Sequence, residues 1–255
     1  MIKFDFRDQT VLVTGSSRGI GRCIATRFAE SGARIILHFN KGSEKAEELL
    51  RSLPGEGHLV FGADLEDPSA IEKMARAAVQ QAGRIDLLIN NAGIYEECAL
   101  PDASFSDWLR IWDRTIAINL SATAHMSYFM GRHMKENGGG KIICISSRGA
   151  FRGEPQAPAY AASKSGMNAM LQSLAKSLAP HHVYVYGVAP GFVETEMAKT
   201  ALSGPQGDSI RRQSPMGRVA TVEDVAHAVL MLASAGNEFM TGTIVDVNGA
   251  SYLRM

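Results

Sequence analysis

A tyrosine and a lysine stand four residues apart in the segment YAASK, at Tyr160 and Lys164. Positions i and i+4 share one face of a helix, so a helix here would bring the two side chains together. A free phenol has a pKa of about 10 and is a weak proton donor at neutral pH. A nearby ammonium can lower such a pKa by about 1–3 units. The pair therefore predicts a tuned acid/base, although the same spacing also occurs on ordinary helix surfaces.

A glycine-rich segment, TGSSRGIG at 14–21, lies between an apolar run and a helical stretch. Glycine permits tight turns and lets backbone N–H groups approach a phosphate at a helix N-terminus. Gly15, Gly19 and Gly21 have the spacing GxxxGxG, which differs from GxGxxG and lacks the Gly-Lys-Ser/Thr ending of a P-loop. We interpret the segment as a pyrophosphate-binding turn, the alternative being a turn without a ligand.

The next apolar run ends in LHFNKGS at 37–43, at the position that selects the cofactor in dinucleotide-binding folds. An acidic residue there binds the ribose 2′-hydroxyl of NAD, whereas basic residues accommodate a 2′-phosphate. This chain has Asn40 followed by Lys41, and Arg18 lies in the glycine-rich segment. The sequence therefore predicts NADP(H) over NAD(H), with Arg18 and Lys41 near the 2′-phosphate. A solvated loop charge is the alternative for Lys41.

Short apolar runs alternate with helical stretches along the chain. The runs occupy 10–15, 34–39, 58–63, 85–90, 141–146, 183–188 and 243–247, and the first helices are predicted at 19–32, 43–53 and 68–83. This alternation indicates βαβ crossovers and a parallel sheet with helices on both faces. No linker interrupts it. We predict one α/β domain over 1–255, doubly wound and Rossmann-type, with a mostly parallel seven-stranded sheet.

Composition argues against several classes of protein. Lys+Arg and Asp+Glu balance at 26 each, so no basic excess points to nucleic acid or an anionic membrane. The three cysteines form no CxxC pair and the histidines show no HExxH-like spacing, so we expect no metal. No apolar run approaches the ~18 residues of a membrane span, and the start has no signal-like apolar region. We expect a cytoplasmic protein without membrane or nucleic-acid partners.

Several motifs together resemble those of the short-chain dehydrogenase/reductase family: TGSSRGIG, NNAG at 90–93, Asn119, Ser147, YAASK and PG at 190–191. They follow the family's order and approximate spacing over essentially the whole chain. Within the family the sequence is most similar to 3-oxoacyl-carrier-protein reductases, in GSSRGIGRCIA, APGFVETEM, MGRVATVEDVAHAVLMLAS and TGTIVDVNG. The resemblance implies NADPH-dependent reduction of a carbonyl substrate to an alcohol, most simply a 3-oxoacyl thioester, by a homotetramer.

The resemblance implies a catalytic tetrad of Asn119, Ser147, Tyr160 and Lys164. Tyr160 would be the general acid that protonates the carbonyl oxygen. Lys164 would lower the pKa of Tyr160 and bind the nicotinamide ribose. Ser147 would hold the substrate oxygen, since a hydroxyl can donate to a carbonyl and still accept from the tyrosine. Asn119 would support a water relay to the lysine.

The resemblance also implies a set of cofactor-binding residues. Asp64 would bind the adenine amino group, with Leu65 offering its backbone N–H, and Thr195 would contact the nicotinamide carboxamide. The full set is Gly15, Ser17, Arg18, Gly19, Ile20, Gly21, Asn40, Lys41, Asp64, Leu65, Asn91, Ala92, Gly93, Tyr160, Lys164, Pro190, Gly191, Val193 and Thr195.

The segment SRGAFRGEPQAPAY at 147–160 carries Arg148, Arg152 and Glu154, more charge than an apolar acyl pocket suggests. Our hypothesis is that Arg148 or Arg152 recognises an anionic or highly polar substrate, because guanidinium pairs well with carboxylate. A surface-facing loop or a subunit contact is the alternative. Phe192 is a further candidate substrate residue.

Residues from about 193 to 217, rich in small and polar types, are predicted to form a mobile lid over the substrate. The resemblance implies an acyl carrier protein as a partner, but the loop ENGGG at 136–140 lacks the basic residues often found there. The alternatives are an alcohol, sugar or polyol dehydrogenase, or a small polar ketone reductase, of the same family. A non-catalytic NADP-binding sensor is a third, remote alternative.

Overall fold

Runs of Val, Ile and Leu form a central sheet in the computed structural model, which describes residues 4–254. The strands are β1 (Thr10–Val13), β2 (Arg34–Phe39), β3 (Leu59–Gly62), β4 (Leu87–Asn90), β5 (Gly140–Ile145), β6 (Val183–Pro190) and β7 (Ile244–Val247). Their order is β3-β2-β1-β4-β5-β6-β7, and each of these pairings is parallel. Helices cover both faces of such a sheet, which explains why its strands are apolar throughout.

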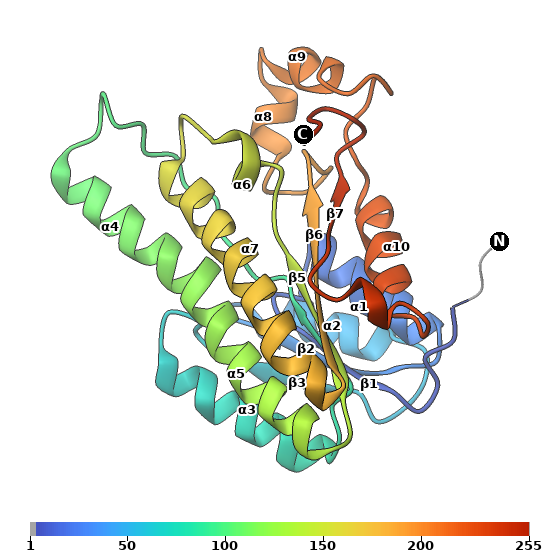
Figure 1. Cartoon of the computed structure of the whole chain (residues 1–255). Coiled ribbons are helices and arrows are strands. Elements are labelled where there is room, and N and C mark those ends of the chain that lie inside the picture. Colours follow the sequence, from blue (N-terminus) through green and yellow to red (C-terminus); the bar gives the residue numbers. More distant parts are fainter. Residues whose placement is uncertain (1–3, 255) are drawn as a thin grey trace.

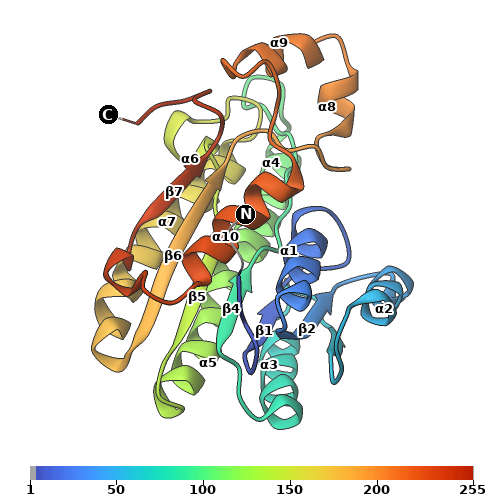
Figure 2. The same ribbon diagram turned by 90° about the vertical axis from the view of Figure 1, so that its right-hand side faces the viewer.

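Two layers of helices enclose the sheet (Figures 1 and 2). One apolar core contains residues of α1 (Gly19–Glu30), α2 (Ser43–Ser52) and α10 (Val222–Ala233). The other contains residues of α3 (Pro68–Ala82), α5 (Ala122–Glu136) and α7 (Pro158–Leu178). This arrangement confirms the predicted doubly wound α/β fold, and the sheet is wholly rather than mostly parallel.

Helix starts and stops follow local chemistry. Asp67 caps α3 by accepting a hydrogen bond from the Ser69 backbone N–H at 2.8 Å, and Pro68 stands in the first turn, where no intrahelical N–H is needed. Helix α1 ends before Gly32, whose φ of 91° suits glycine. The predicted strands differ from those observed by one or two residues at their ends, apart from β2, which matches at both.

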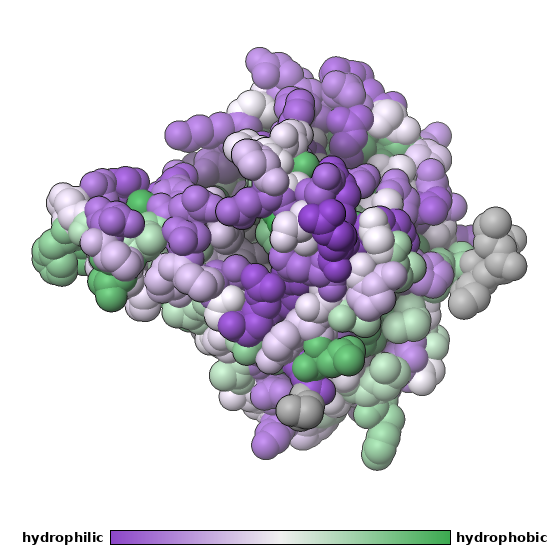
Figure 3. All heavy atoms as spheres, turned by 90° about the horizontal axis from the view of Figure 1, so that it is seen from above, coloured by the Kyte–Doolittle hydropathy of each residue, from purple (hydrophilic) through white to green (hydrophobic). Residues whose placement is uncertain are grey.

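Helix α4 (Phe105–Ile116) runs into α5 through a π-helical turn at Ala117–Ser121. A π-helical turn has i→i+5 hydrogen bonds and therefore holds one residue more than the α-helical turn it replaces. Figure 3 shows hydrophobic side chains gathered at the outer end of the molecule, where α4 begins. Leu100, Phe105 and Leu109 are 66%, 78% and 48% exposed there.

The chain above the sheet is built from short elements. Helix α6 (Gly149–Arg152) follows β5, and α8 (Lys199–Ser203) and α9 (Gly207–Arg212) follow β6. Two 3-10 turns, Ala179–His181 and Glu238–Met240, complete the chain. Segment 193–217 thus contains two short helices, which pack around Leu202 and Ile210. Within residues 4–254, no helix combines the length and apolarity needed to cross a membrane.

Candidate active site

The candidate residues gather at the carboxyl edge of the sheet. The glycine-rich segment follows β1, NNAG begins at the end of β4, Ser147 follows β5 and PG ends β6. The strand order reverses between β1 and β4, and open α/β sheets bind ligands at such a switch point. The fold therefore brings to one edge the motifs that lie far apart in the sequence.

The glycine-rich segment is closely packed, and its glycines are required by geometry. Gly15 has a φ of 62°, and a Cβ atom at Gly21 would lie 2.4 Å from both the Gly15 carbonyl oxygen and Asn91 Nδ2. Asn91 Nδ2 donates to the carbonyls of Thr14 and Gly15 at 2.9 and 3.0 Å. The residues present thus fit a dinucleotide: the turn brings backbone N–H groups and the start of α1 to one place, with no side chain that would block a pyrophosphate.

His38 supports this segment and was not among the predicted residues. The Gly15 N–H donates to His38 Nδ1 at 3.0 Å, so the ring proton resides on Nε2, which donates to the Ala63 carbonyl at 3.0 Å. Burial lowers the pKa of His38, which keeps this tautomer neutral. The histidine thus joins the glycine-rich segment to the chain after β3. The signal in the sequence was one polar residue within the apolar run RIILHF.

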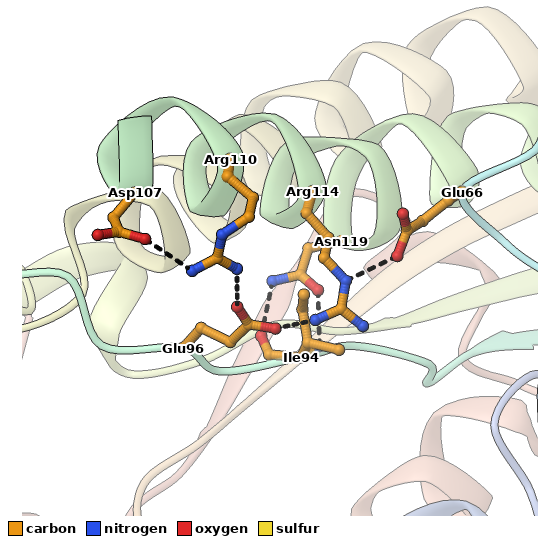
Figure 4. Close-up of polar contacts among 7 residues, drawn as sticks. All are labelled: Glu66, Ile94, Glu96, Asp107, Arg110, Arg114 and Asn119. Carbon is orange, nitrogen blue, oxygen red and sulfur yellow. Dashed lines mark hydrogen bonds and ion pairs between the residues drawn. The ribbon is translucent and has the colours of Figure 1, made fainter. Parts of the chain in front are cut away.

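Asn119 lies in the π-helical turn, and its side chain is fully engaged. Its Oδ1 accepts from the Ile94 N–H at 2.8 Å, and its Nδ2 donates to the Ile94 carbonyl at 3.0 Å (Figure 4). Asn119 Nδ2 also donates to Ser163 Oγ at 3.1 Å. A Cβ atom at Gly93 would lie 3.3 Å from Asn119 Oδ1 and 3.5 Å from Lys164 Nζ. Asn119 and Lys164 therefore meet beside Gly93, which needs to lack a side chain.

Tyr160 and Lys164 lie on α7 as the four-residue spacing predicts. Lys164 Nζ lies 5.9 Å from the centroid of the Tyr160 ring and donates to the Ile145 carbonyl at 2.8 Å. Ser147 Oγ accepts from the Gly149 N–H at 3.0 Å, and a hydrogen bond from Ser147 acts on the Tyr160 phenol. Tyr160, Lys164 and Ser147 are thus brought together, with Asn119 behind the lysine.

The electrostatics of Tyr160 differ from the expectation. Burial raises the pKa of Tyr160; the hydrogen bond from Ser147 opposes this rise, and the charge of Glu154 adds to it. The Tyr160 pKa is therefore shifted upwards rather than in the expected direction, because desolvation of the phenolate is the largest influence on it. A raised pKa keeps the phenol protonated at neutral pH, which suits a proton donor.

Burial also lowers the pKa of Lys164, to about 8 from its ordinary value of 10.5. At pH 7 the lysine is still charged, so its burial costs folding free energy. We expect Lys164→Met to raise Tm by a few degrees at pH 7 while lowering kcat/KM at least about a hundredfold. Thermal unfolding and turnover of both proteins at pH 7 measure these effects.

The difference in Tm between the wild type and Lys164→Met should change with pH in a defined direction. Between pH 8 and 10.5 the unfolded chain binds the Lys164 proton and the folded chain releases it, so the wild type gains stability as pH rises. The Tm advantage of Lys164→Met should therefore shrink from pH 7 to pH 9.5. A wild type that is more stable than the variant at pH 7 would contradict the burial argument.

The predicted 2′-phosphate residues lie on the surface beside an acid that sequence reasoning missed. Arg18 Nη1 lies 3.0 Å from Glu196 Oε2, and Lys45 Nζ lies 3.6 Å from Glu196 Oε1. Lys41 is exposed at the end of β2. Glu196 escaped notice because its pairing with Arg18 spans 178 residues of sequence.

The residues expected to contact the adenine and the nicotinamide lie on two neighbouring parts of the sheet edge. Asn40 Nδ2 donates to Asp64 Oδ1 at 3.3 Å, which places these two candidates side by side, and the neighbouring Leu65 is buried. Thr195 Cγ2 lies 3.6 Å from the position of a Cβ atom on Gly19. The glycine-rich segment, which also holds Ser17 and Ile20, and the segment of Pro190, Gly191, Val193 and Thr195 therefore flank one space. Asn91, Ala92 and Gly93 lie below it.

The two candidate arginines lie in different surroundings. Arg148 is only 3% exposed, donates through Nη1 to Ser251 Oγ at 2.6 Å and lies over the Phe192 ring. The surface-facing alternative is therefore wrong for Arg148. Arg152 is exposed, with Nε lying 3.5 Å from Glu154 Oε1 and Nη1 donating to Gln213 at 3.4 Å. Of the two arginines, only Arg152 forms an ion pair with Glu154.

Tyr95 is a site residue that sequence reasoning missed. Its ring packs edge-to-face against Tyr160, with ring centroids 5.1 Å apart. Burial, followed by the charge of Glu154, raises the pKa of Tyr95 to about 12, so it is a neutral hydroxyl at physiological pH. Glu154 influences the pKa values of both tyrosines and its side chain is 17% exposed. The available signal was an aromatic residue two positions after the NNAG turn.

A network of ion pairs fixes the segment that carries Tyr95 (Figure 4). Glu96 pairs with Arg114 and, at 3.8 Å, with Arg110, and both arginines project from α4. Arg114 also pairs with Glu66 at 2.7 Å. Because Asn119 holds Ile94 and α4 holds Glu96, Tyr95 is fixed from both sides.

No group of three or more metal-ligating side chains that could hold an ion occurs within the described residues 4–254.

Comparison with known proteins agrees with this geometry. The family model described as enoyl-(acyl carrier protein) reductase matches residues 15–250. The chain is 36% identical to D-threitol dehydrogenase of Mycolicibacterium smegmatis, over 97% of this chain and 95% of that protein. It is 35% identical to 3-oxoacyl-(acyl-carrier-protein) reductase FabG of Escherichia coli, over 98% and 99%.

A solved structure gives the same answer for the fold. The crystal structure of a dehydrogenase/reductase from Sinorhizobium meliloti 1021 superposes with a TM-score of 0.90 at 29% sequence identity, covering 98% of each chain. The family model spans most of the sequence, and the relatives above 30% identity cover nearly all of it. Together with the glycine-rich turn and the assembled Asn119, Ser147, Tyr160 and Lys164, these matches show that the chain belongs to the short-chain dehydrogenase/reductase family.

Proposed function

We propose that the protein is an NADP(H)-dependent oxidoreductase that reduces a carbonyl group to an alcohol, with Tyr160 as the general acid. The observation that carries this proposal is the half-buried, protonated Tyr160 phenol beside Ser147 and Lys164, at the edge of the sheet that also holds the glycine-rich turn. The nicotinamide, when bound, supplies the hydride. Ser147 orients the carbonyl oxygen by donating its hydroxyl proton in a hydrogen bond.

The proton path follows from the contacts of the tetrad. Tyr160 gives its phenol proton to the substrate oxygen, which gains negative charge as the carbonyl is reduced. The ammonium of Lys164, 5.9 Å from the ring centroid, then stabilises the phenolate that remains. Asn119 fixes the Ile94 backbone and lies beside Lys164, a position suited to carrying the replacement proton towards the lysine through water.

The first candidate substrate is a 3-oxoacyl thioester, which the motifs in APGFVETEM and the similarity to FabG favour. We expect a thioester substrate without a tight acyl carrier protein contact, because ENGGG at 136–140 has no basic residue. Segment 193–217 would cover the substrate as a lid, since it follows the proposed nicotinamide-contacting segment directly.

The second candidate is a small polyhydroxylated ketone or the matching polyol, and the surroundings of Tyr160 favour it. Tyr95, Arg152 and Glu154 offer a phenol, a guanidinium and a carboxylate at the catalytic tyrosine, whereas an acyl chain would need apolar side chains there. Buried or half-buried polar groups recognise substrate hydroxyls strongly, because they are left unpaired with any other substrate. D-Threitol dehydrogenase, a relative at 36% identity, acts on a polyol by its name.

The preference for NADP(H) rests on the end of β2. Asn40 stands where an acid would bind the ribose 2′-hydroxyl, and Arg18, Lys41 and Lys45 supply positive charge around it. A 2′-phosphate would compete with Glu196 for Arg18 and Lys45. Because these ion pairs are exposed, exchanging one anion for another costs little.

One experiment tests both the reaction and the cofactor. Purified protein is supplied with NADPH or NADH and with acetoacetyl thioester, dihydroxyacetone or erythrulose, and cofactor oxidation is followed by absorbance. We expect NADPH to give at least about tenfold higher kcat/KM than NADH. Turnover of the thioester alone supports the first candidate and turnover of the hydroxyketones alone supports the second. Binding of NADPH without reduction of any carbonyl, with polyols also unoxidised, would overturn the proposed reaction.

We also propose a homotetramer in the cytoplasm. The exposed apolar side chains Leu100, Phe105 and Leu109 at α4 would be buried between copies of the chain (Figure 3). A monomer in gel filtration would refute the assembly.

All three cysteines are free thiols, which fits the reducing compartment that we propose, the cytoplasm.

A further inference from the structure

The structure contains a cavity that the residues of the tetrad do not line. It has a volume of about 240 Å³, and none of Asn119, Ser147, Tyr160 and Lys164 lines it. Its walls come from Arg148 and Phe192, from the segment that includes Ile210 and Ser214, and from the chain after β7 that includes Ser251. Segments distant in sequence thus line a space that none of the four residues of the tetrad reaches.

The charges on the wall leave one cation without a counter-ion. Arg218 pairs with Asp224 at 2.6 Å, and Asp246 pairs with Arg254 at 2.7 Å, so these four charges cancel. Arg148 has no carboxylate within 4.0 Å among residues 4–254. It is nevertheless 97% buried. Burying an unpaired charge is costly, so a guanidinium in this state needs a reason.

Some N–H groups of the Arg148 guanidinium have no hydrogen-bond acceptor within residues 4–254. Its Nη1 donates to Ser251 Oγ at 2.6 Å, whereas Nε and Nη2 donate to no group in the described part of the chain. Because Ser251 accepts through its oxygen, its hydroxyl proton stays available for a further acceptor. A guanidinium offers parallel N–H groups that match the two oxygens of a carboxylate or phosphate. The cavity has room for such an anion and several waters, each of which occupies about 30 Å³.

We propose that this cavity binds a small oxyanion, a carboxylate or phosphate group, through Arg148 and Ser251. The group is either a free anion or part of a substrate that extends past Ser147, the neighbour of Arg148. Ile210 and Ser214 belong to the segment we propose as the lid, and the Ser214 hydroxyl already donates to the Gly249 carbonyl at 2.7 Å. A bound anion would therefore join this segment to the chain after β7.

The test measures anion binding directly and needs no turnover. Inorganic phosphate and acetate are titrated into the cofactor-free protein at constant ionic strength, and binding is followed by calorimetry and by the rise in Tm. We expect Arg148→Met to weaken binding of the better anion at least about tenfold, since hydrogen bonds to charged groups contribute strongly. Arg51→Met is the matched control: it removes the same charge from an exposed position on α2, outside the cavity and the proposed lid, and should bind as the wild type does.

Further variants cover the other ways an anion could bind. Should Arg148→Met fail to fold, Arg148→Lys keeps the charge without the planar fork and should still weaken binding several-fold. Binding that survives in the Arg148 variants, or that disappears only in Arg18→Met, would overturn the proposal and assign the anion to the cofactor segment. Absence of binding by the wild type would overturn it as well.

Inhibition kinetics then separate the two sources of the oxyanion. Competition between phosphate and the carbonyl substrate, lost in Arg148→Met, assigns the anion to the substrate. Phosphate that binds equally well with substrate present assigns it to a separate ligand. Both results support the site, and the calorimetric result stands whether or not the proposed carbonyl reduction is found.

Discussion

Replacing Tyr160 by phenylalanine should lower kcat by about 10²–10⁴-fold, the range that general acid catalysis contributes. The substitution removes one oxygen and with it the proton that the substrate oxygen must receive. Tyr160 is half-buried, its ring is packed edge-to-face by Tyr95, and Lys164 Nζ lies 5.9 Å from the ring centroid, so no neighbouring side chain offers the same proton at the same place. The variant should still bind NADPH within about threefold of the wild-type affinity, because the glycine-rich turn is untouched. Stopped-flow turnover and fluorescence titration with NADPH measure the two quantities.

The surface residue Tyr128 provides the control for this substitution. It is 56% exposed on α5, so Tyr128→Phe removes the same oxygen far from the chemistry and should leave kcat unchanged. Retention of more than a tenth of wild-type kcat in Tyr160→Phe would show that another group donates the proton. Tyr95, whose ring touches Tyr160, would then be the first residue to replace.

Gly21→Ala should weaken cofactor binding and destabilise the fold. The added methyl would lie 2.4 Å from the Gly15 carbonyl oxygen and 2.4 Å from Asn91 Nδ2, and no rotamer can relieve the contact with the backbone. Asn91 would lose its hydrogen bonds to Thr14 and Gly15, and the turn that we propose as the pyrophosphate site would change shape. Overpacking of this kind costs about 1–3 kcal/mol. We expect Tm to fall by several degrees and the Kd for NADPH to rise more than about tenfold.

Gly83→Ala separates this packing effect from the general cost of replacing glycine. Gly83 ends α3 with a φ of 78°, but no atom lies within 4 Å of its added Cβ. Its alanine variant should lose about 1–2 kcal/mol through backbone strain and keep wild-type affinity for NADPH. A Gly21→Ala protein that binds NADPH as tightly as Gly83→Ala does would show that the turn is not the pyrophosphate site.

The sheet and the Tyr160–Lys164 pair could be predicted because they depend on local patterns, whereas Ser147 and Asn119 were expected from the family resemblance alone. A parallel strand buried on both faces needs an apolar run, and the helical period brings Lys164 close to Tyr160. His38 interrupts one of these runs, yet its role depends on Gly15 and Ala63, which lie on other segments. A polar residue in a buried strand indicates a partner but does not identify it.

The directions of the charged side chains could not be predicted from spacing. Arg148 and Arg152 lie four residues apart, but the Arg148 N–H bonds to the Pro190 carbonyl and its guanidinium reaches Ser251, 103 residues away. Arg152 ends α6 and points to Glu154 and Gln213 instead. The raised pKa of Tyr160 could not be predicted for a similar reason: the sequence shows the lysine four residues away but not the burial that raises the pKa.

The π-helical turn at Ala117–Ser121 joins α4 to α5 without a loop, so the number of residues between these two helices is fixed. Each helical residue adds a rotation of about 100°, so deleting one residue near Asn119 would turn all of α5 by that angle. Met126, Met130 and Met134, now buried against the sheet, would swing away from it. Loops between elements absorb insertions and deletions during evolution. Near the π-helical turn the gain or loss of a single codon would therefore separate Asn119 from the core that α5 supplies.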